Sequence, residues 1–273
     1  MLEVDKITKS VLNEYLIFTR QIALKAGQIL ADGFNKGKDI KYKGAINPVT
    51  QFDLKSEKYI INQITNKFPT HSILAEEGSD IDNNSLFRWV IDPLDGTVNY
   101  AHRFPVYSVS IALQCNNKSV IGVVYDPERE EMYSAASGMG AFLNSKKISV
   151  SKEKNLKRSL LATGFAYNIN SARKNNLGIF ARMMKKSQAV RRLGSAALDL
   201  CWLACGRLDG FWEFYLHPWD TAAAIIIVEE AGGKVSQING EEYSIFDDNI
   251  LTSNKLIHKQ MIKALAGSRK VKR

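Results

Sequence analysis

The spacing of apolar residues divides the chain into two regions with different patterns. Over residues 9–34 apolar side chains recur every three or four positions, which predicts a long amphipathic helix, and a second helix is predicted over about 53–68. Closely spaced apolar runs follow without helical stretches between them, at residues 72–75, 87–92, 106–113, 120–125, 131–135 and 141–143. Such runs predict a mixed, largely antiparallel sheet in an α+β N-terminal half.

After about Val150 the pattern changes to alternating strands and helices. Strands are predicted at residues 160–163, 211–215, 234–238 and 250–252, and helices at 195–205, 220–230 and 256–265. The run from Ala222 to Val228 is apolar on every side of its helix, so this helix should be buried. We therefore expect an N-terminal half over residues 1–149 and a C-terminal α/β half over 150–273, packed tightly because no linker separates them.

Composition places the chain among ordinary globular proteins. Of its 273 residues 45% are hydrophobic and 24% are charged, and no apolar run approaches the ~20 residues that span a bilayer. Three cysteines are too few for a disulfide framework, and the first residues lack a signal-peptide pattern. We expect a protein of the reducing cytoplasm that makes no membrane contact.

The net charge of +9 favours anionic partners, such as phosphorylated small molecules, nucleic acid or an acidic protein. Part of the charge lies in the basic tail at 268–273 and part in the pair Arg191 and Arg192. A frayed end is the more common explanation of the tail, and a solvated basic face or a dimer contact that of the arginine pair. Charge alone therefore leaves an RNA contact open.

The segment Asp92-Pro93-Leu94-Asp95-Gly96-Thr97 carries the clearest chemistry. It follows a buried strand, and its proline and glycine predict a turn that brings two carboxylates and a backbone carbonyl toward one point. Ligands that are all oxygen suit a hard cation such as Mg²⁺. The same residue types are also ordinary turn formers, so the motif by itself does not decide between a metal site and a solvated turn.

Three further acids stand where they could join this segment. Glu76 ends the strand that precedes it, and Asp53 lies in the first turn of the second predicted helix. Asp220 opens the buried apolar helix, where it serves either as a helix cap or as a metal ligand. An unpaired charge is costly in the interior, and a bound cation would remove that cost.

Four segments, in order, resemble the motifs of the inositol monophosphatase family. Residues 89–100, and residues 219–224 together with 230–233, resemble its two signatures; residues 48–53 and 75–78 resemble two further motifs. Residues 191–201 and 206–213 are similar to the bacterial branch called extragenic suppressor proteins. The resemblance implies an αβαβα sandwich of the sugar-phosphatase type, with a mixed, largely antiparallel N-terminal sheet followed by a smaller C-terminal α/β sheet.

The resemblance also implies the roles of individual residues. Two or three Mg²⁺ ions would be held by Glu76, Asp92, the Leu94 carbonyl, Asp95 and Asp220. A water would be activated by Thr97 together with Asp53 and Glu76. Substrate would contact Asp95, Gly96, Thr97, Ser195, Ala196, Glu213 and Asp220, with Glu213 accepting hydrogen bonds from hydroxyls. Lys43 lies in a basic loop, and its approach to the metal site is left open.

The activity implied is a Mg²⁺-dependent, lithium-sensitive phosphomonoesterase that releases phosphate from inositol monophosphate. The resemblance also implies a homodimer. One alternative is a fructose bisphosphate or nucleotide phosphatase on the same scaffold; the short segment between Glu77 and Asp92 argues weakly against the nucleotide branch. Another is a factor associated with RNA or RNA polymerase. Cys201, Cys205 and His217 are predicted to be structural.

Overall fold

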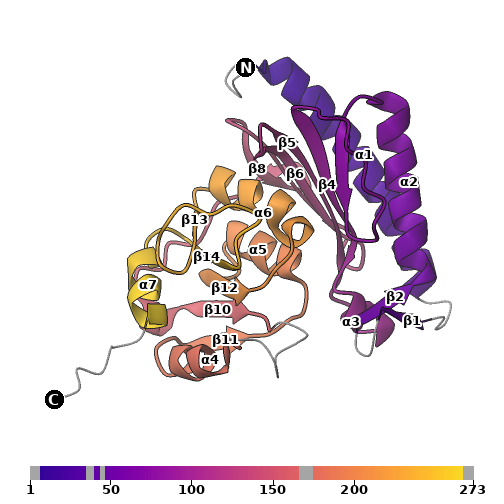
Figure 1. Cartoon of the computed structure of the whole chain (residues 1–273). Coiled ribbons are helices and arrows are strands. Elements are labelled where there is room, and N and C mark those ends of the chain that lie inside the picture. The colour runs from indigo at the N-terminus through magenta and orange to yellow at the C-terminus, as the bar shows by residue number, and fades with distance from the viewer. Residues whose placement is uncertain (1–6, 35–39, 44–46, 166–174, 267–273) are drawn as a thin grey trace.

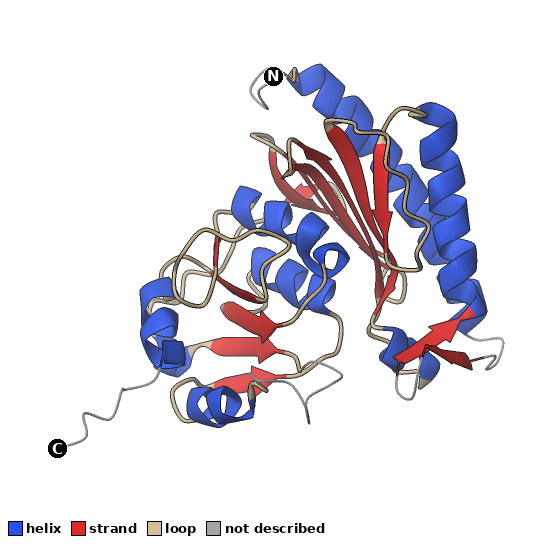
Figure 2. Cartoon of the chain, viewed as in Figure 1, coloured by secondary structure: helices blue, strands red, loops and turns tan. Residues whose placement is uncertain are grey.

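The computed structural model describes residues 7–34, 40–43, 47–165 and 175–266, and its elements stack in five layers (Figure 1). Two sheets alternate with three pairs of helices, so helices cover both faces of each sheet (Figure 2). From the N-terminal side the pairs are α1 (Lys9–Phe34) with α2 (Gln51–Lys67), α5 (Ala196–Ala204) with α6 (Pro218–Glu230), and α4 (Leu177–Met184) with α7 (His258–Ala266). The predicted αβαβα sandwich is confirmed.

The larger sheet has seven strands in the order β3-β4-β5-β6-β7-β8-β9. The β3–β4 pair is parallel and the other pairs are antiparallel. The strands are β3 (Ser72–Ala75), β4 (Phe87–Asp95), β5 (Ser108–Cys115), β6 (Lys118–Asp126), β7 (Glu131–Ala136), β8 (Gly140–Leu143) and β9 (Lys146–Lys147). Every residue of β5 is buried, because helices cover both faces of the sheet.

The smaller sheet has five strands in the order β11-β10-β12-β14-β13. Strand β10 runs parallel to both of its neighbours, whereas β14 runs antiparallel to both of its own. The strands are β10 (Leu160–Thr163), β11 (Ala189–Arg191), β12 (Gly210–Phe214), β13 (Lys234–Ser236) and β14 (Asn249–Ser253), and a 3₁₀ helix, Leu156–Arg158, precedes β10. The division of the chain after residue 149 stays a prediction.

Helix α6 lies between the two sheets and touches β6 with its backbone. The Ser119 hydroxyl in β6 donates a hydrogen bond to the Ala222 carbonyl at 2.8 Å. A Cβ on Gly122 would lie only 2.2 Å from the carbonyl oxygen of Ala223, so the absence of a side chain there permits the contact. A helix that is apolar on all sides requires burial on all sides, and the predicted buried helix is confirmed.

Polar contacts join the two sheets at the edge of this shared core. The Arg207 guanidinium, which follows α5, donates to both carboxylate oxygens of Glu131 in β7, at 2.6 and 2.5 Å, and to the Tyr133 hydroxyl at 3.0 Å. A forked Arg–carboxylate contact fixes orientation as well as distance. Within the described part of the chain, no helix is both long and apolar enough to cross a membrane.

The segment with the acidic motif differs from its prediction. Strand β4 continues through Pro93 to Asp95 instead of ending at Asp92, and its register against β5 shifts between the two acids. Proline cannot donate a ladder hydrogen bond, which explains why the irregularity falls here. A short helix, α3 (Thr97–Ala101), then begins where only a turn was predicted.

Several short elements were also missed. A hairpin of β1 (Ile40–Lys43) and β2 (Asn47–Thr50) replaces the predicted basic loop, and α4 and β11 were absent from the prediction. Strands of three or four residues contain too few positions to reveal a period, and an eight-residue helix contains little more than two turns. The longer predicted elements agree with the structure except for shifts of one or two residues at most ends and up to three at a few.

Candidate active site and metal centre

Short-range hydrogen bonds shape the acidic segment. The Asp92 carboxylate accepts a hydrogen bond from the Leu94 amide at 2.9 Å, and the Thr97 hydroxyl donates to the Leu94 carbonyl at 3.0 Å. Gly96 has φ +91°, and a Cβ there would lie 2.9 Å from the Val106 carbonyl oxygen. Only glycine fits this left-handed, crowded position. The Leu94 carbonyl retains a second lone pair that could face a cation.

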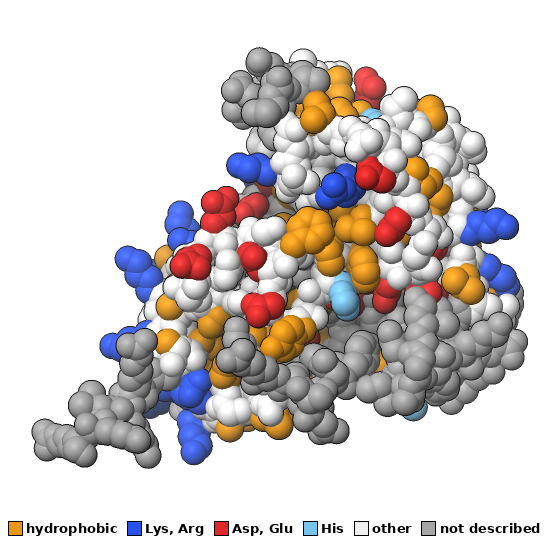
Figure 3. Space-filling view, in the orientation of Figure 1, with side chains coloured by type: hydrophobic (Ala, Val, Ile, Leu, Met, Phe, Trp, Pro, Cys, Tyr) orange, Lys and Arg blue, Asp and Glu red, His pale blue; other side chains and the backbone are white. Residues whose placement is uncertain are grey.

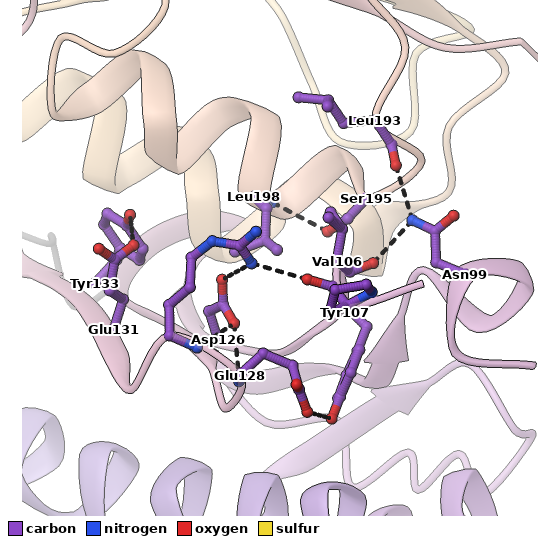
Figure 4. Close-up of polar contacts among 12 residues, drawn as sticks. Asn99, Val106, Tyr107, Asp126, Glu128, Glu131, Tyr133, Leu193, Ser195 and Leu198 are labelled. Atoms are coloured by element: carbon purple, nitrogen blue, oxygen red, sulfur yellow. Dashed lines mark hydrogen bonds and ion pairs between the residues drawn. The ribbon is translucent and has the colours of Figure 1, made fainter. Parts of the chain in front are cut away.

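Asp95 connects this segment to the N-terminus of α5, about a hundred residues further along the chain. Its Oδ2 accepts hydrogen bonds from the Ser195 hydroxyl and from the Ala197 amide at 2.9 Å. Ser195 is also the N-cap of α5, since its Oγ accepts from the Leu198 amide at 3.3 Å (Figure 4). The positive end of the helix dipole therefore faces the Asp95 carboxylate.

Asn99 holds the same two segments together, and the sequence analysis assigned it no role. Its Nδ2 donates to the Val106 carbonyl and to the Leu193 carbonyl, each at 2.8 Å (Figure 4). One amide group thus ties α3 to the loop that precedes α5. The only sequence signal was the place of Asn99 inside the first signature segment, residues 89–100.

Asp220 takes the capping role, and its position is compatible with the metal-ligand role that the sequence left open. As the third residue of α6 it accepts a hydrogen bond from the His217 amide at 2.6 Å, which completes a capping box. One carboxylate oxygen from each of Asp92, Asp95 and Asp220 also lies within 4.8 Å of the other two. A compact set of carboxylate oxygens has the chemistry and size that a hard divalent cation requires.

Glu76 extends this group of acids on the β3 side. Its amide donates to the Ile91 carbonyl at 3.2 Å, and its carboxyl shares a hydrogen bond with that of Asp92. Burial, followed by the charge of Asp220, raises the pKa of Glu76 to about 8. Burial and then the charge of Glu76 raise the pKa of Asp92 well above its usual value.

Burial also raises the pKa values of the other two acids of the group, Asp95 and Asp220. Burial raises the pKa of Asp95 to about 6, although its hydrogen bonds from Ser195 and Ala197 work in the opposite direction. Burial, with the nearby charge of Asp95, raises the pKa of Asp220 to about 7. Without a cation, Glu76 therefore keeps a proton at neutral pH and Asp220 is partly protonated, and a bound cation would displace these protons.

The start of α2 lies against the acidic segment. Asp53 is buried in the first turn of this helix, and its charge contributes to the raised pKa of Glu76. One turn further on, the Ser56 hydroxyl donates to the Pro93 carbonyl at 3.1 Å. Buried Glu57 accepts hydrogen bonds from the Glu77 amide at 2.9 Å and the Ser79 hydroxyl. Nothing in the sequence set Ser56 and Glu57 apart from other helix residues.

A pocket opens beside the acids, lined by the predicted residues Asp95, Gly96, Ser195, Ala196, Glu213 and Asp220. Acidic side chains gather in the middle of the molecular face shown in Figure 3, whereas most lysines and arginines lie at its periphery. Burial and the charge of Asp220 raise the pKa of Glu213 to about 8, and Arg192 opposes them. A Cβ on Gly164 would lie 2.0 Å from the Glu213 carboxylate, so this glycine makes room for the acid.

The structure places the remaining predicted residues as follows. Thr97 and Asp53 lie beside the group of acids and not among the residues that line the pocket. The side chain of Lys43 and the basic tail at 268–273 lie outside the described residues. Asp199 and Arg192 line the pocket although they were not predicted as site residues.

The predicted structural residues are packed or hydrogen-bonded. Cys201 is buried in the core and the Cys205 thiol donates to the Trp202 carbonyl. The His217 ring stacks on that of Trp219, with centroids 5.0 Å apart. These contacts agree with the packing roles expected for them.

Comparisons with known proteins agree with this geometry. A model of the inositol monophosphatase family matches residues 11–270. An inositol-1-monophosphatase of Synechocystis sp. is 42% identical over 261 residues, which are 95% of this chain and 91% of that protein. The Nus factor SuhB of Salmonella typhimurium is 38% identical over 243 residues, or 88% of this chain and 91% of that protein.

A solved structure agrees over the same length. The crystal structure of the extragenic suppressor protein suhB from Bartonella henselae aligns with a TM-score of 0.88 and 35% identity, covering 93% of this chain and 99% of that one. Sequence and fold therefore match together across both sheets. The chain is a phosphatase and belongs to the inositol monophosphatase family.

Proposed function

We propose that the chain is a Mg²⁺-dependent phosphomonoesterase that hydrolyses inositol monophosphate to inositol and phosphate. The observation that carries this proposal is the convergence of Asp92, Asp95 and Asp220 within 4.8 Å beside the pocket. Together with Glu76 and the Leu94 carbonyl, these residues would hold two or three Mg²⁺ ions. Bound there, the ions would activate a water and neutralise charge on the phosphate oxygens.

The chain's own residues would prepare the reaction on either side of the phosphate. The Thr97 hydroxyl donates to the Leu94 carbonyl, so its oxygen lone pairs are available to accept a hydrogen bond from the attacking water. Asp53 and Glu76 would receive the proton that this water loses. As water adds to phosphorus, the ester P–O bond breaks and the departing inositol oxygen takes up a proton.

The pocket would position the phosphate and the inositol ring. Gly96 lets the backbone amides of the acidic segment approach phosphate oxygens closely. Ser195 and Ala196, at the start of α5, add a helix N-terminus, whose positive dipole end attracts anions. Glu213 would accept hydrogen bonds from ring hydroxyls.

Phosphate release from inositol 1-phosphate tests the proposal. We expect activity in Mg²⁺ that disappears with a chelator, returns when Mg²⁺ is restored, and is inhibited by Li⁺. Fructose 1,6-bisphosphate and a phosphoadenosine nucleotide, compared by kcat/KM, test the alternative substrates. Inactivity toward every small phosphomonoester would falsify the proposal. A higher kcat/KM for another ester would show that this ester, and not inositol monophosphate, is the preferred substrate.

We propose the homodimer as the working state and the cytoplasm as its location. A second role, in contact with RNA or RNA polymerase, is favoured by the similarity to the Nus factor SuhB and by the exposed pair Arg191 and Arg192. Light scattering measures the oligomer, and a monomeric mass would contradict the first proposal. Capture from a lysate with Asp95→Asn tests the second role, and recovery of neither RNA nor polymerase subunits would contradict it.

A further inference from the structure

Helix α5 carries one charged residue, Asp199, and the position of this residue is unusual. Asp199 is 2% exposed and lines the pocket together with Glu213 and Arg192. Its Oδ1 is fully buried and has no hydrogen-bond partner among the described residues. The sequence comparison with the family assigned no role to this side chain.

A buried carboxyl oxygen without a hydrogen-bond partner, such as Asp199 Oδ1, destabilises the folded protein. The other residues of α5 are buried and apolar, and they form part of the core between the sheets. An apolar side chain would fill the same space without desolvation cost, because buried polar groups without partners are unfavourable. A polar group in the pocket would complete the hydrogen bonds that the described residues leave open.

The charges around the pocket indicate which chemical group would do so. Burial, then the charges of Glu213 and Asp95, raises the pKa of Asp199 well above its usual value, and Arg192 acts in the opposite direction. The Asp199 carboxyl accepts a hydrogen bond in either protonation state, and its protonated form also donates one. A hydroxyl also donates and accepts, so it matches both hydrogen-bonding capacities of the acid.

The absence of a side chain at Gly194 leaves space for the Arg192 guanidinium. Gly194 has φ +88°, and a Cβ there would lie 2.7 Å from the Arg192 guanidinium. One guanidinium nitrogen thus lies close to the backbone that leads into α5. It contributes donors to a pocket lining that also contains the acids Glu213 and Asp199.

We propose that Asp199 is a specificity-determining residue that hydrogen-bonds a hydroxyl of the substrate ring, and that Asp199, Glu213 and Arg192 together form a hydroxyl-recognition subsite. The ligand class is a cyclic polyol with neighbouring hydroxyls. The inference rests on the proposed phosphatase function and extends it, because it names a further residue that distinguishes a polyol ester from other phosphate esters.

Substrate discrimination in two variants tests the subsite. For wild type, Asp199→Ala and Asp199→Asn, kcat/KM is measured with inositol 1-phosphate and with 4-nitrophenyl phosphate, which has no ring hydroxyl. Asp199→Ala should lower the ratio of the two values about tenfold, mainly through KM of the inositol ester, as expected for one lost hydrogen bond. Asp199→Asn keeps a donor and an acceptor and should stay within about threefold of wild type.

A matched control separates recognition from the general loss of a buried acid. Asp126 is fully buried, but its oxygens accept hydrogen bonds from the Glu128 and Arg129 amides and from the Arg129 guanidinium. Asp126→Asn should lower the unfolding temperature without changing the substrate ratio. If Asp199→Ala does not fold, Asp199→Leu removes the same hydrogen bonds while filling the space. Equal losses on both esters would overturn the inference.

Binding of free inositol provides a readout that does not depend on turnover. Titration of myo-inositol, followed by ligand-observed NMR, should show weaker binding to Asp199→Ala by about tenfold and near wild-type binding to Asp199→Asn. If wild type hydrolyses neither ester but Asp199→Ala still loses inositol affinity, the proposed function fails and the subsite stands. Inositol affinity that is absent in wild type or unchanged in Asp199→Ala overturns the subsite.

Discussion

The two walls of the pocket are built in different ways. On the side of the larger sheet, residues 92–97 form a structure whose hydrogen bonds join neighbours, such as Asp92 with the Leu94 amide. On the side of the smaller sheet, Ser195, Glu213 and Asp220 come from three separate elements. The first wall supplies the contiguous acids of the candidate cation site, and the second adds helix N-termini and buried acids suited to a polyol.

The two walls depend on different parts of the fold. The acidic segment is one continuous stretch that runs from the end of β4 to the start of α3. The opposite wall depends on the packing of α5 and α6 between the sheets, and contacts such as Asn99 with Leu193 and Asp95 with Ser195 set its distance from the first wall. Mutations in each wall and in the contacts between them should therefore have separable effects.

The largest effect is expected where the walls meet, at Asp95. Asp95→Asn removes a charged candidate ligand and weakens the acceptor used by Ser195 and Ala197. We expect kcat/KM for inositol 1-phosphate to fall on the order of 10³-fold at saturating Mg²⁺, since an essential electrostatic group is lost. Glu153→Gln, on an acid away from the pocket, is the control. Unaltered turnover in Asp95→Asn would show that the cation site is misplaced.

A smaller effect is expected at the contact that spaces the walls. Asn99→Ala removes both 2.8 Å hydrogen bonds, to the Val106 and Leu193 carbonyls. The loop before α5 should shift, and kcat should fall roughly 10- to 100-fold, because displacements of about 1 Å cost that much in catalysis. Asn239→Ala, at an exposed turn, should have no effect on kcat. A wild-type rate in Asn99→Ala would mean that packing alone sets the spacing.

The stability of the metal-free protein should fall as pH rises from acidic to neutral and above. The pKa values of Glu76, Asp220 and Glu213 are raised to about 8, 7 and 8, so the folded state binds more protons than the unfolded state. Their contribution to stability is complete below about pH 4 and is lost as pH rises through about 8.

Thermal unfolding measured from pH 5 to pH 8.5 checks this sign. The midpoint should fall with rising pH in a chelator, by several degrees, and saturating Mg²⁺ should reverse the fall, because ions bind the ionised carboxylates. The stabilisation by Mg²⁺ should therefore increase across the same interval. A midpoint in chelator that rises with pH would contradict the assignment of buried, protonated acids to both walls.

The smallest effect belongs to the cap of α5. Ser195→Ala removes the hydroxyl that donates to Asp95 and accepts from the Leu198 amide. Loss of an N-cap typically costs about 1 kcal/mol of unfolding free energy, measurable by urea denaturation. Ser195→Thr preserves the hydroxyl and should recover most of the stability. Equal stability of the alanine and threonine variants would show that the Ser195 hydroxyl does not stabilise the helix.

The sequence predicted the first wall better than the second. The pattern of residues 92–97 indicated the acidic segment, and the apolar run from Ala222 to Val228 correctly indicated a buried helix beginning near Asp220. Local pattern did not show that β4 would continue through Pro93, because the β5 partner decides where a strand ends. Nor did it identify Asp199 or Asn99, whose importance arises from neighbours on distant elements.

Gly122 in β6 affects the position of helix α6. Its missing side chain lets the Ala223 carbonyl rest on β6, less than one helical turn beyond Asp220. A methyl group at position 122 would clash with the Ala223 backbone, which cannot rotate away as a side chain can. Helix α6 would therefore have to move away from β6 as a whole. The distance between Asp220 and the acids of β4 therefore depends on the absence of a side chain at position 122, and Gly122→Ala would shift the candidate cation site without altering any of its residues.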